Sequence, residues 1–590
     1  MPIDKTTAEL GVLHGRRVTG DDFWELKISD DDELKTRYCE YQSDIAVNER
    51  VVFYESMSGA RMMDSPYALF KEIFNDPAFS DYHHVWSVRS PSVIPSEYKH
   101  HPRVSFVKRN TDAHLFFLNR AKYLVGNSVQ PDFLVRRPEQ KFLNTWHGIA
   151  YKTLGRDINN PLGAAASVYS LLQATHVLTP CEFMTEIQLD RFSMRGVYSG
   201  DLAEVGYPRQ DLTINLNAQT EQSLRTQLSL DPGKKTVLYA PTWRGQKGGA
   251  RFDATHLEDD IAALSELDAN VVFLAHHIML RHIKNVDFSK IIVPPADVNT
   301  NELLAVVDLL ITDYSSIFFD FLVTGKPVVH YFYDYEEYES ERGLTLPPED
   351  LPGLVIRERT DLVRVVSDLI RKEFVPPPEY ISARERFCSH DDGKASERTK
   401  KWFIEGSARA VKHVPAKSRP TIVFWGGRMD TSARTRQFLD QLEREARSNQ
   451  KDVTLFVSFS VQSNPVVLDT IKRLGTSISV VARKNYEMAM TEAEAIARKR
   501  TDADDPIPKE TAPRSLLRGT IDRLLSKIPA TIHKNDSRQS NRAPATKKEL
   551  QDAMYRREYR RIFGDSEFDE IVKFNGLSLF WKKLAEHAIK

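Results

Sequence analysis

The segment from Asp308 to Asp320 is where this sequence most clearly combines local structure with chemistry. It reads Asp-Leu-Leu-Ile-Thr-Asp-Tyr-Ser-Ser-Ile-Phe-Phe-Asp, so an apolar run ends in hydroxyl and acidic groups. The apolar part predicts a buried parallel strand, which puts Ser315 and Ser316 at its carboxyl end, where open α/β sheets bind ligands. Backbone N–H groups of these serines at a helix start would suit a phosphate oxygen. The structural alternative is that Ser315 caps the helix and Asp320 continues its polar face.

A histidine occupies a comparable position earlier in the chain, in Thr145-Trp146-His147-Gly148. A tight turn after an apolar strand would expose the ring of His147 to a cleft, and Gly148 would let the backbone approach a ligand closely. Histidine's ordinary pKa of about 6.5 suits a general base. Taken alone, such a histidine is more often structural.

Other cationic side chains follow predicted strands or turns. Arg209 in Gly-Tyr-Pro-Arg and Arg244 in Ala-Pro-Thr-Trp-Arg could each hold two phosphate oxygens, or form surface ion pairs. His276 and His277 end another strand, and we favour His276 as the one facing the cleft. Neither an Asp-X-Asp pair placed for a divalent ion nor a Gly-rich phosphate loop is present, so we expect no metal site and no cofactor.

The elements that position these groups alternate short β-rich runs with amphipathic stretches, which is typical of βαβ units. Two such sets are separated near residue 215, and a cleft between them would bring both sets of carboxyl-end loops face to face. The expected strands of both sets are listed here: Val51–Tyr54, His84–Val88, Val104–Val107, Tyr123–Gly126 and Phe142–Trp146, then Thr236–Tyr239, Val271–Leu274, Ile291–Val293, Leu309–Thr312 and Val328–Tyr331. Residues 1–45, with Phe23–Ile28 as a candidate strand, fit neither set and form an N-terminal extension.

A third α/β unit is expected after a basic, Pro-containing linker near Val411–Arg419, where Thr421–Trp425 begins a new strand. Within it, residues 499–548 are rich in Pro, Ser, Asn and charge and predict a partly disordered insertion. In this insertion, residues 514–528 place apolar side chains on one helical face with bases beside them. That pattern fits either a helix on an anionic membrane surface or a helix packed on its own domain.

Composition narrows the class of protein. The 590 residues suffice for about three to four domains. The 81 Lys and Arg residues almost cancel the 82 Asp and Glu residues, so net charge gives no reason to expect a nucleic-acid partner. Three widely separated cysteines fit neither a disulfide framework nor a zinc site and favour a reducing compartment. We find neither a signal-peptide pattern nor about 18 consecutive apolar residues.

Taken in order, five motifs resemble the CDP-glycerol glycerophosphotransferase family, which includes teichoic acid and capsule polymerases. The resemblance covers roughly Val51–Glu405. Its motifs are Asn144-Thr145-Trp146-His147-Gly148, Gly155-Arg156-Asp157, Gly206-Tyr207-Pro208-Arg209, Leu238-Tyr239-Ala240-Pro241-Thr242-Trp243-Arg244 and Ile311-Thr312-Asp313-Tyr314-Ser315-Ser316.

The resemblance implies a GT-B fold, in which two Rossmann-like domains face each other, and we assign residues 46–215 to the acceptor side and 216–410 to the CDP-donor side. It also implies transfer of a polyol phosphate from CDP-glycerol or CDP-ribitol to a hydroxyl of a phosphoglycan or lipid-linked acceptor, with release of CMP. The expected location is the cytoplasm, at the inner face of the cell membrane.

The resemblance also assigns roles to residues. It implies that His147 and His276 are catalytic and that the donor is bound by Gly148, Ile149, Ala150, Tyr151, Arg209, Thr242, Trp243, Arg244, Ser315, Ser316 and Asp320. Members of the family usually carry an Arg two residues before the second His, where this chain has Leu274, and Arg281 or Lys284 is a candidate substitute. Either His147 or His276 could be the base, with the other binding phosphate.

The third unit, residues 411–590, resembles half of another GT-B glycosyltransferase through Ile422–Gly427 and the late run from Phe563 to Trp581. A docking or regulatory domain is the alternative. We therefore hypothesise that the chain is part of a larger polymer synthase. Two other functions stay open from the residues: a glycosyltransferase using a nucleotide sugar, and a non-catalytic nucleotide- or polymer-binding module.

Overall fold

The structure is a computed structural model, and it describes residues 28, 30–158, 160–242, 244–246, 249–251, 253–274, 288–484, 488–499 and 546–588. Most of the candidate strand 23–28, most of the insertion 499–548 and the candidate membrane helix 514–528 lie outside these residues.

The first sheet has eight strands in the order β15-β7-β6-β5-β4-β1-β2-β3, and all of them except β15 run parallel. Its strands are β1 (Asn48–Glu55), β2 (His83–Val88), β3 (Val104–Lys108), β4 (Ala121–Gly126), β5 (Lys141–Asn144), β6 (His176–Thr179), β7 (Asp201–Glu204) and β15 (Lys412–His413). The predicted strands of the first set all exist, because apolar runs such as Val51–Tyr54 can be buried on both faces of a parallel sheet. Loops after parallel strands consequently gather at one edge.

The helices that pack on the first sheet come from two distant parts of the chain. They are α2 (Asp31–Asp44), α3 (Asp64–Asn75), α4 (Asp112–Arg120), α5 (Ala165–Leu172), α6 (Glu182–Glu186), α7 (Pro208–Ile214) and α16 (Ala395–Phe403). Helix α16 packs on α3 and α7, and Trp402 donates from Nε1 to Asp201 Oδ2 at 2.7 Å. The chain therefore returns to the first sheet before it enters the third.

The second sheet has the order β11-β8-β12-β13-β14 and is wholly parallel. Its strands are β8 (Thr236–Ala240), β11 (Asn270–Phe273), β12 (Leu309–Thr312), β13 (Val328–Tyr331) and β14 (Leu354–Ile356), beside a small hairpin of β9 (Arg244–Gln246) and β10 (Gly249–Arg251). Its helices are α8 (Ala218–Gln227), α9 (Ala254–Ser265), α11 (Thr300–Val306), α12 (Ile317–Phe321), α13 (Tyr335–Arg342), α14 (Arg359–Arg371) and α15 (Pro378–Phe387). The strand predicted at Ile291–Val293 is wrong, because only Ile292 forms a bridge, to Val272.

The third sheet has the order β18-β17-β16-β19 and is also parallel. It consists of β16 (Thr421–Gly427), β17 (Asp452–Ser458), β18 (Ser479–Arg483) and β19 (Glu570–Lys573), with α17 (Ala433–Ser448), α18 (Pro465–Leu474), α19 (Glu492–Lys499), α21 (Lys547–Phe563) and α22 (Leu579–Ala585). One apolar core continues from the first sheet into this sheet, whereas one face of the second sheet has a separate core around Tyr239 and Tyr331.

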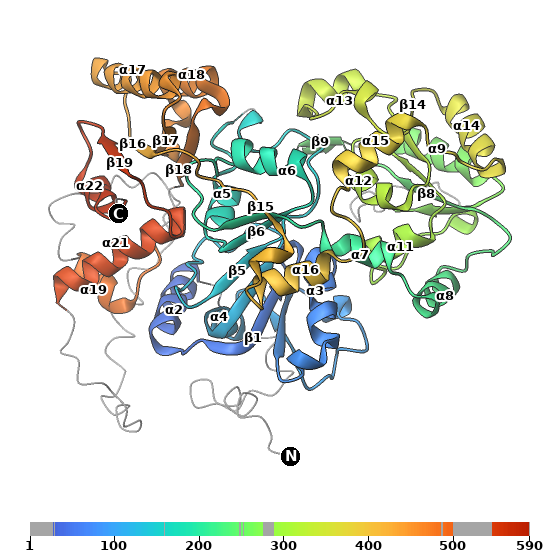
Figure 1. The fold of residues 1–590 in the computed structure, drawn as a ribbon, viewed down its shortest axis with the longest axis horizontal. Helices are drawn as coiled ribbons and strands as arrows, with labels where there is room; N and C mark the ends of the chain where they lie inside the picture. The colour runs from blue at the N-terminus through green and yellow to red at the C-terminus, as the bar shows by residue number, and fades with distance from the viewer. Residues whose placement is uncertain are drawn as a thin grey trace.

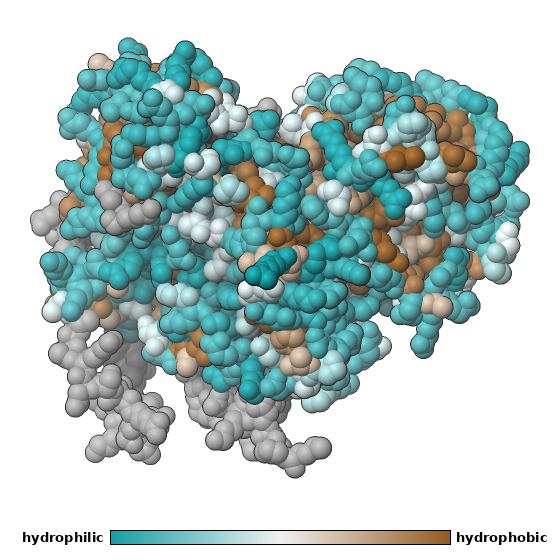
Figure 2. Space-filling view, in the orientation of Figure 1, coloured by the Kyte–Doolittle hydropathy of each residue, from teal (hydrophilic) through white to brown (hydrophobic). Residues whose placement is uncertain are grey.

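Figure 1 shows the first sheet at the centre, the second sheet and its helices to the right, and the third sheet at the upper left. The surface in Figure 2 is mainly hydrophilic and is notched at the top between the lobes that carry the third and second sheets. In the part of the chain that the structure describes, we find no helix long and apolar enough to cross a membrane.

Candidate active site

His147 lies on a tight turn that follows β5. The strand ends at Asn144, and the turn is made by left-handed backbone at Trp146, with φ of 52°, and by Gly148, with φ of 136°. The ring of His147 stacks on that of Trp146 at a centroid distance of 4.5 Å, and the residue is exposed. The predicted exposed turn is thus confirmed.

Gly148 allows this turn to touch both sheets. A Cβ added there would lie 2.9 Å from Nη2 of Arg209 and 3.6 Å from Oγ of Ser316. The first contact is too close for a side chain, and φ at this position is one that only glycine adopts readily. The sequence therefore needs glycine beside His147, where the loop meets groups from the second sheet.

The tautomer of His147 is determined by Asn127, which directly follows β4. Nδ1 of His147 lies 2.9 Å from the carbonyl oxygen of Asn127, and a carbonyl can only accept a hydrogen bond. Nδ1 therefore carries the proton, which leaves the lone pair of the neutral ring on Nε2. Desolvation by the surrounding protein lowers the pKa of His147, although the Asn127 carbonyl and the Asp64 charge oppose this. The ring is accordingly neutral near pH 7 and able to accept a proton.

Beneath the turn, Arg209 joins the two sheets through a buried ion network. Nη1 of Arg209 donates to the His147 carbonyl at 3.0 Å and to Asp64 Oδ2 at 3.3 Å, and Nη2 donates to Asp320 Oδ1 at 2.7 Å. Asn127 Nδ2 also donates to Asp64 Oδ2, at 2.9 Å. Burial is the main reason that the pKa of Asp320 rises to about 6, with the Arg209 charge opposing. The predicted residues Arg209 and Asp320 are thus brought together, but they bond to each other, and Arg209 bonds to Asp64 and the His147 loop.

Sequence reasoning missed Asp64 and Asn127. Asp64 begins α3 with φ of 68°, a conformation that the sequence does not reveal. Asn127 could have been found, because it directly follows β4 and so lies at the same sheet edge as His147.

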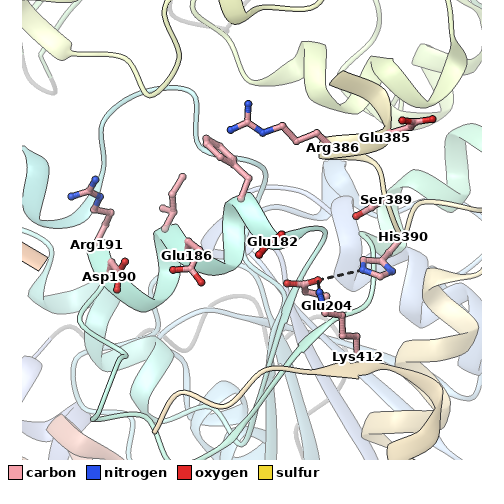
Figure 3. Close-up of a pocket in the computed structure, with 12 residues that line it drawn as sticks. Glu182, Glu186, Asp190, Arg191, Glu204, Glu385, Arg386, Ser389, His390 and Lys412 are labelled. Atoms are coloured by element: carbon pink, nitrogen blue, oxygen red, sulfur yellow. Dashed lines mark hydrogen bonds and ion pairs between the residues drawn. The ribbon is translucent and has the colours of Figure 1, made fainter. Parts of the chain in front are cut away.

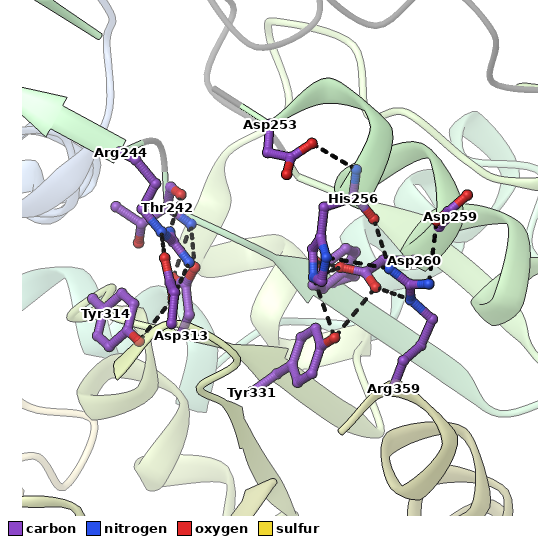
Figure 4. A network of polar contacts seen from close by, with 12 residues as sticks. Thr242, Arg244, Asp253, His256, Asp259, Asp260, Asp313, Tyr314, Tyr331 and Arg359 are labelled. Atoms are coloured by element: carbon purple, nitrogen blue, oxygen red, sulfur yellow. Dashed lines mark hydrogen bonds and ion pairs between the residues drawn. The ribbon is translucent and has the colours of Figure 1, made fainter. Parts of the chain in front are cut away.

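On the second sheet, Arg244 is held by two carboxylates. Its Nη1 donates to Asp313 Oδ2 at 2.8 Å, and its Nε donates to Asp334 Oδ2 at 2.5 Å, as the left half of Figure 4 shows in part. Asp313 also accepts from the backbone N–H of Thr242 at 2.8 Å. Tyr314 donates to Asp334 and lies under the Arg244 guanidinium. Thr242 and Arg244, which were predicted together, are therefore connected through Asp313.

The right half of Figure 4 shows a separate network on the face of the second sheet that has its own core. Buried Asp260 on α9 accepts from Arg359 Nε at 2.5 Å and from Tyr239 at 3.2 Å, and it lies 3.3 Å from His256 Nε2. It ties α9 and α14 to the sheet.

Ser315 and Ser316 occupy the turn between β12 and α12 and are half-buried. Ser315 Oγ accepts from the backbone N–H of Ile317 at 3.3 Å, although the N-cap residue of α12 is Ser316, whose side chain makes no capping hydrogen bond. Asp320 does not continue a polar face, because it is buried. Phosphate binding by the serine amides stays a prediction.

Residues 149–153, which follow His147, contact the second sheet, and we call this set of contacts the clasp. Buried Ile149 and Ala150 lead to Tyr151, whose ring meets that of Phe318 edge-on at 5.2 Å. Thr345, after α13, donates through its N–H to the Tyr151 carbonyl and through Oγ1 to the Ala150 carbonyl, each at 2.8 Å. The donor segment proposed from the sequence thus links both sheets.

Lys152 lies in this clasp and was not predicted. It forms a β-bridge with Leu344, and Nζ lies 5.8 Å from the ring centre of Tyr338. We find no hydrogen bond or ion pair of the Lys152 ammonium with another described residue. Burial lowers the pKa of Lys152 to about 8 even though the Asp313 charge raises it.

Some predicted residues cannot be placed. His276, Trp243, Arg281 and Lys284 lie outside the described residues, so the structure tests neither the second histidine nor the two candidates for the Arg that Leu274 replaces. Leu274 is described and packs at the edge of the main core. None of these observations decides between His147 and His276 as the base.

A pocket of about 620 Å³ lies between α6 and the end of α15, and it contains none of the predicted site residues (Figure 3). Buried Glu204 on its wall accepts from Lys412 at 2.8 Å and lies 3.4 Å from His390 Nε2. Five carboxylates against three Lys or Arg side chains make this lining unsuited to a phosphate-rich ligand. The five are Glu182, Glu186, Asp190, Glu204 and Glu385.

Comparisons with known proteins agree with this geometry. The family model described as CDP-Glycerol:Poly(glycerophosphate) glycerophosphotransferase matches residues 38–403. A teichoic acid glycerol-phosphate transferase of Staphylococcus aureus is 30% identical over 378 residues, which cover 60% of this chain and 92% of that protein. A teichoic acid poly(glycerol phosphate) polymerase of Bacillus subtilis is 28% identical, and the match covers 60% of this chain but 49% of the polymerase.

Solved structures give the same result. The wall teichoic acid polymerase TagF superposes with a TM-score of 0.54 at 25% identity, covering 63% of this chain and 93% of that structure. A His-to-Asn variant of TagF soaked with CDPG superposes with a TM-score of 0.53 at 25% identity and the same coverage. The α/β fold with parallel sheets is therefore shared with TagF.

Proposed function

Because this chain belongs to the CDP-glycerol:poly(glycerophosphate) glycerophosphotransferase family, we propose that it transfers glycerol phosphate from CDP-glycerol to a hydroxyl of a growing polymer. The chain is a transferase, as the relatives of this family are. CMP is the product that leaves. CDP-ribitol is the second donor to test, because ribitol-phosphate polymerases are also among the relatives, at 26% identity.

The observation that carries the proposal is the fixed tautomer of His147. The acceptor oxygen attacks the phosphorus that bears glycerol, and its proton passes to Nε2 of His147 while Nδ1–H stays on the Asn127 carbonyl. The new P–O bond forms as the bond from that phosphorus to the CMP oxygen breaks, and CMP takes the electron pair. In the competing assignment His276 is the base and His147 binds phosphate.

The donor diphosphate is expected between the His147 loop and the turn of Ser315 and Ser316. Support comes from the 3.6 Å between the added Gly148 Cβ and Ser316 Oγ, which shows how closely the two meet. Lys152 supplies a cation at the same junction, since its ammonium is half-buried beside Tyr338. Arg209 and Asp320 act by holding the loop, and Arg244 holds Asp313 and Thr242. We propose that Lys152 and the backbone N–H groups of Ser315 and Ser316 neutralise the diphosphate without a metal ion.

The finer architecture is also a proposal. We infer that the first and second sheets are the acceptor and donor halves of a GT-B enzyme, within residues 46–215 and 216–410, and that residues 411–590 form a third unit. Helix α16 and β15 crossing back to the first sheet support a joint between the halves. A phosphate-containing wall or capsule acceptor would place the enzyme at the inner membrane face, by analogy with the teichoic acid relatives.

CMP release tests this function. The purified chain is incubated with CDP-glycerol or CDP-ribitol, with and without an oligo(glycerol phosphate) acceptor, beside His147→Ala. We expect acceptor-dependent release from CDP-glycerol, and a loss of roughly 10²- to 10⁴-fold in the variant, since this is what a general base contributes. Release from neither donor would overturn the function. Full activity of a folded His147→Ala would overturn its role as base and favour His276.

A further inference from the structure

A basic groove runs over the carboxyl ends of β2 and β3 of the first sheet, beside α2 and the loop that follows β4. Its wider part, about 510 Å³, is lined by the bases Lys35, Arg89, Lys108 and Arg109, against the acids Asp31 and Asp132. A contiguous pocket of about 320 Å³ shares Arg109, Pro131 and Asp132 and extends to Ser58 and Gln130. The lining of the wider part therefore carries a net positive charge.

The groove reaches the turn that carries the base. Arg89 donates through Nε to the carbonyl oxygen of Ser58 at 2.8 Å. The backbone N–H of Ser58 donates to Ser128 Oγ at 2.9 Å, and that of Met57 donates to Asn127 Oδ1 at 2.8 Å. Asn127 is the residue whose carbonyl holds His147 Nδ1. Met57, Ser58 and Asn127 thus connect the groove to His147 through hydrogen bonds.

Met57 and Ser58 both have left-handed backbone conformations. Met57 and Ser58 have φ of 48° and 54°, an uncommon conformation for residues other than glycine, and Met57 is exposed. Such strain persists where the surroundings enforce it and is frequent at ligand sites.

The cations differ in how much of their charge is already used. Arg109 lies 3.6 Å from buried Glu55, and Lys35 lies 3.9 Å from Asp132. Arg89 uses only Nε for Ser58, and its terminal nitrogens have no hydrogen bond or ion pair among the described residues. A planar guanidinium whose Nη1–Nη2 edge is free matches a pair of phosphate oxygens.

We propose that this groove binds the phosphodiester backbone of the acceptor chain and delivers its terminal hydroxyl to His147. The proposal rests on the proposed function, and the location of the groove on the first sheet supports it. The predicted donor groups Ser315 and Ser316 lie on the second sheet, whereas the groove is lined by α2, α5, the loops that follow strands of the first sheet, and Arg561 of α21. A nucleophile has to enter in line with and opposite to the leaving CMP, and an acceptor site on the first sheet fits this requirement if the donor is held by the second sheet. A chain with one negative charge per unit is the ligand that several aligned cations select.

The test compares a long with a short acceptor. The variant is Arg89→Gln/Lys108→Gln, and the control is Arg371→Gln/Lys372→Gln, which removes two exposed charges at the end of α14. The probes are a fluorescein-labelled oligo(glycerol phosphate), neutral dextran and free glycerol. CMP release from CDP-glycerol gives KM for each acceptor, and fluorescence anisotropy gives the binding of the labelled chain without donor.

For the long acceptor we expect KM and Kd to rise roughly 10- to 100-fold in the variant, since each charged hydrogen bond is worth about 1.5 kcal/mol or more. The salt dependence of binding should become shallower, while KM for CDP-glycerol and turnover of free glycerol stay unchanged. The charge-removing control should behave like the wild type. Arg89→Lys, which keeps the charge but loses the geometry to Ser58, should retain most of the affinity.

Three outcomes would overturn the proposal. The first is unchanged KM and Kd for the long acceptor in a wild type that releases CMP. The second is loss in Arg89→Lys equal to that in Arg89→Gln, which would make the effect one of loop geometry. The third is a variant that loses binding to phosphatidylglycerol vesicles but keeps the oligomer, which would assign the groove to a lipid surface. If the wild type releases no CMP at all, the proposed function fails, while anisotropy still reports on the groove.

Discussion

At the scale of single residues, the site depends on groups that do not react. Asn127 fixes the proton on His147 Nδ1, and Asp64 holds both Asn127 and Arg209. Arg209, which looks like a phosphate ligand in the sequence, is buried and bonded to two carboxylates. A guanidinium in such a position orients its neighbours, because both of its terminal nitrogens already donate to protein oxygens.

Asp64→Asn tests how the buried network tunes the base. The Asp64 charge raises the pKa of His147, so its removal lowers that pKa further and moves the acid limb of the pH–rate profile to lower pH. Asparagine tolerates the left-handed φ of this position, so the backbone is not newly strained. We expect about 1–3 kcal/mol less stability and a lower kcat, because one buried acceptor is lost.

The profile of log kcat/KM against pH measures the limb, and denaturant unfolding measures stability. Asp112→Asn, which affects the contacts to Arg37 and Tyr41 on the opposite face of β1, is the control and should leave the limb in place. An acid limb that moves upward in Asp64→Asn contradicts the network.

We expect the titration of Lys152 to produce the alkaline limb of the pH–rate profile. Its pKa of about 8 means that the ammonium loses its charge as the pH rises through that value, so activity should fall there. Lys152→Arg keeps the charge at all these pH values and should remove the limb, whereas Lys152→Met should lower activity throughout. The pH–rate profiles of the three proteins decide this. An alkaline limb that persists in Lys152→Arg would show that another group titrates.

At the scale of elements, the loop after β5 and the turn after α13 act as one unit. Gly343 has φ of 66°, and a Cβ there would lie 2.9 Å from Cγ2 and Oγ1 of Thr153. The Thr153 N–H donates to the Gly343 carbonyl at 3.1 Å, beside the Thr345 contacts. Through this clasp the second sheet positions the segment that begins at His147.

Thr345→Val tests the clasp with little change of shape. It removes the Oγ1 hydrogen bonds to the Ala150 and Tyr151 carbonyls, and we expect stability to fall by about 1 kcal/mol. Because the loop loosens beside His147, kcat should fall several-fold. Denaturant unfolding and CMP release measure the two effects. Thr226→Val, which removes an exposed hydrogen bond within α8, should leave kcat unchanged, and an equal loss there would refute the role of the clasp.

At the scale of the whole molecule, the third sheet is docked on the first through polar as well as apolar contacts. Arg156, in the Gly155-Arg156-Asp157 motif, donates to the carbonyls of Ile478 and, at 2.6 Å, of Gly475. Tyr169 donates to the Ala482 carbonyl at 2.5 Å. A motif within the transferase region therefore also fastens the third unit.

Arg156→Ala should consequently weaken the whole assembly. Two charge-assisted hydrogen bonds are lost at the interface, so we expect the free energy of unfolding to fall by about 2–3 kcal/mol. Arg364→Ala removes an exposed pair on α14 and should change stability by less than about 0.5 kcal/mol. Equal Tm values for Arg156→Ala and the wild type would mean that the polar contacts do not hold the units together.

The sequence by itself determined the strands of the parallel sheets and the turn of His147. Apolar runs such as Val51–Tyr54 and Leu309–Thr312 are local signals, and a strand–His–Gly pattern allows few conformations. The family motifs in the sequence also identified the reaction class, and the match to the family model supports that identification. The strand expected at Ile291–Val293 failed because a three-residue apolar run does not specify a pairing partner.

Only the tertiary structure decided what the charged residues contact. Asp64, Asn127 and Asp320 are far apart in the sequence, and their convergence on Arg209 and His147 depends on how parallel strands align their carboxyl ends. The basic groove is equally invisible in a nearly neutral sequence, because four cations from α2 and two strand ends become neighbours only after the sheet forms. Contacts between distant segments depend on packing, which local residue patterns do not encode.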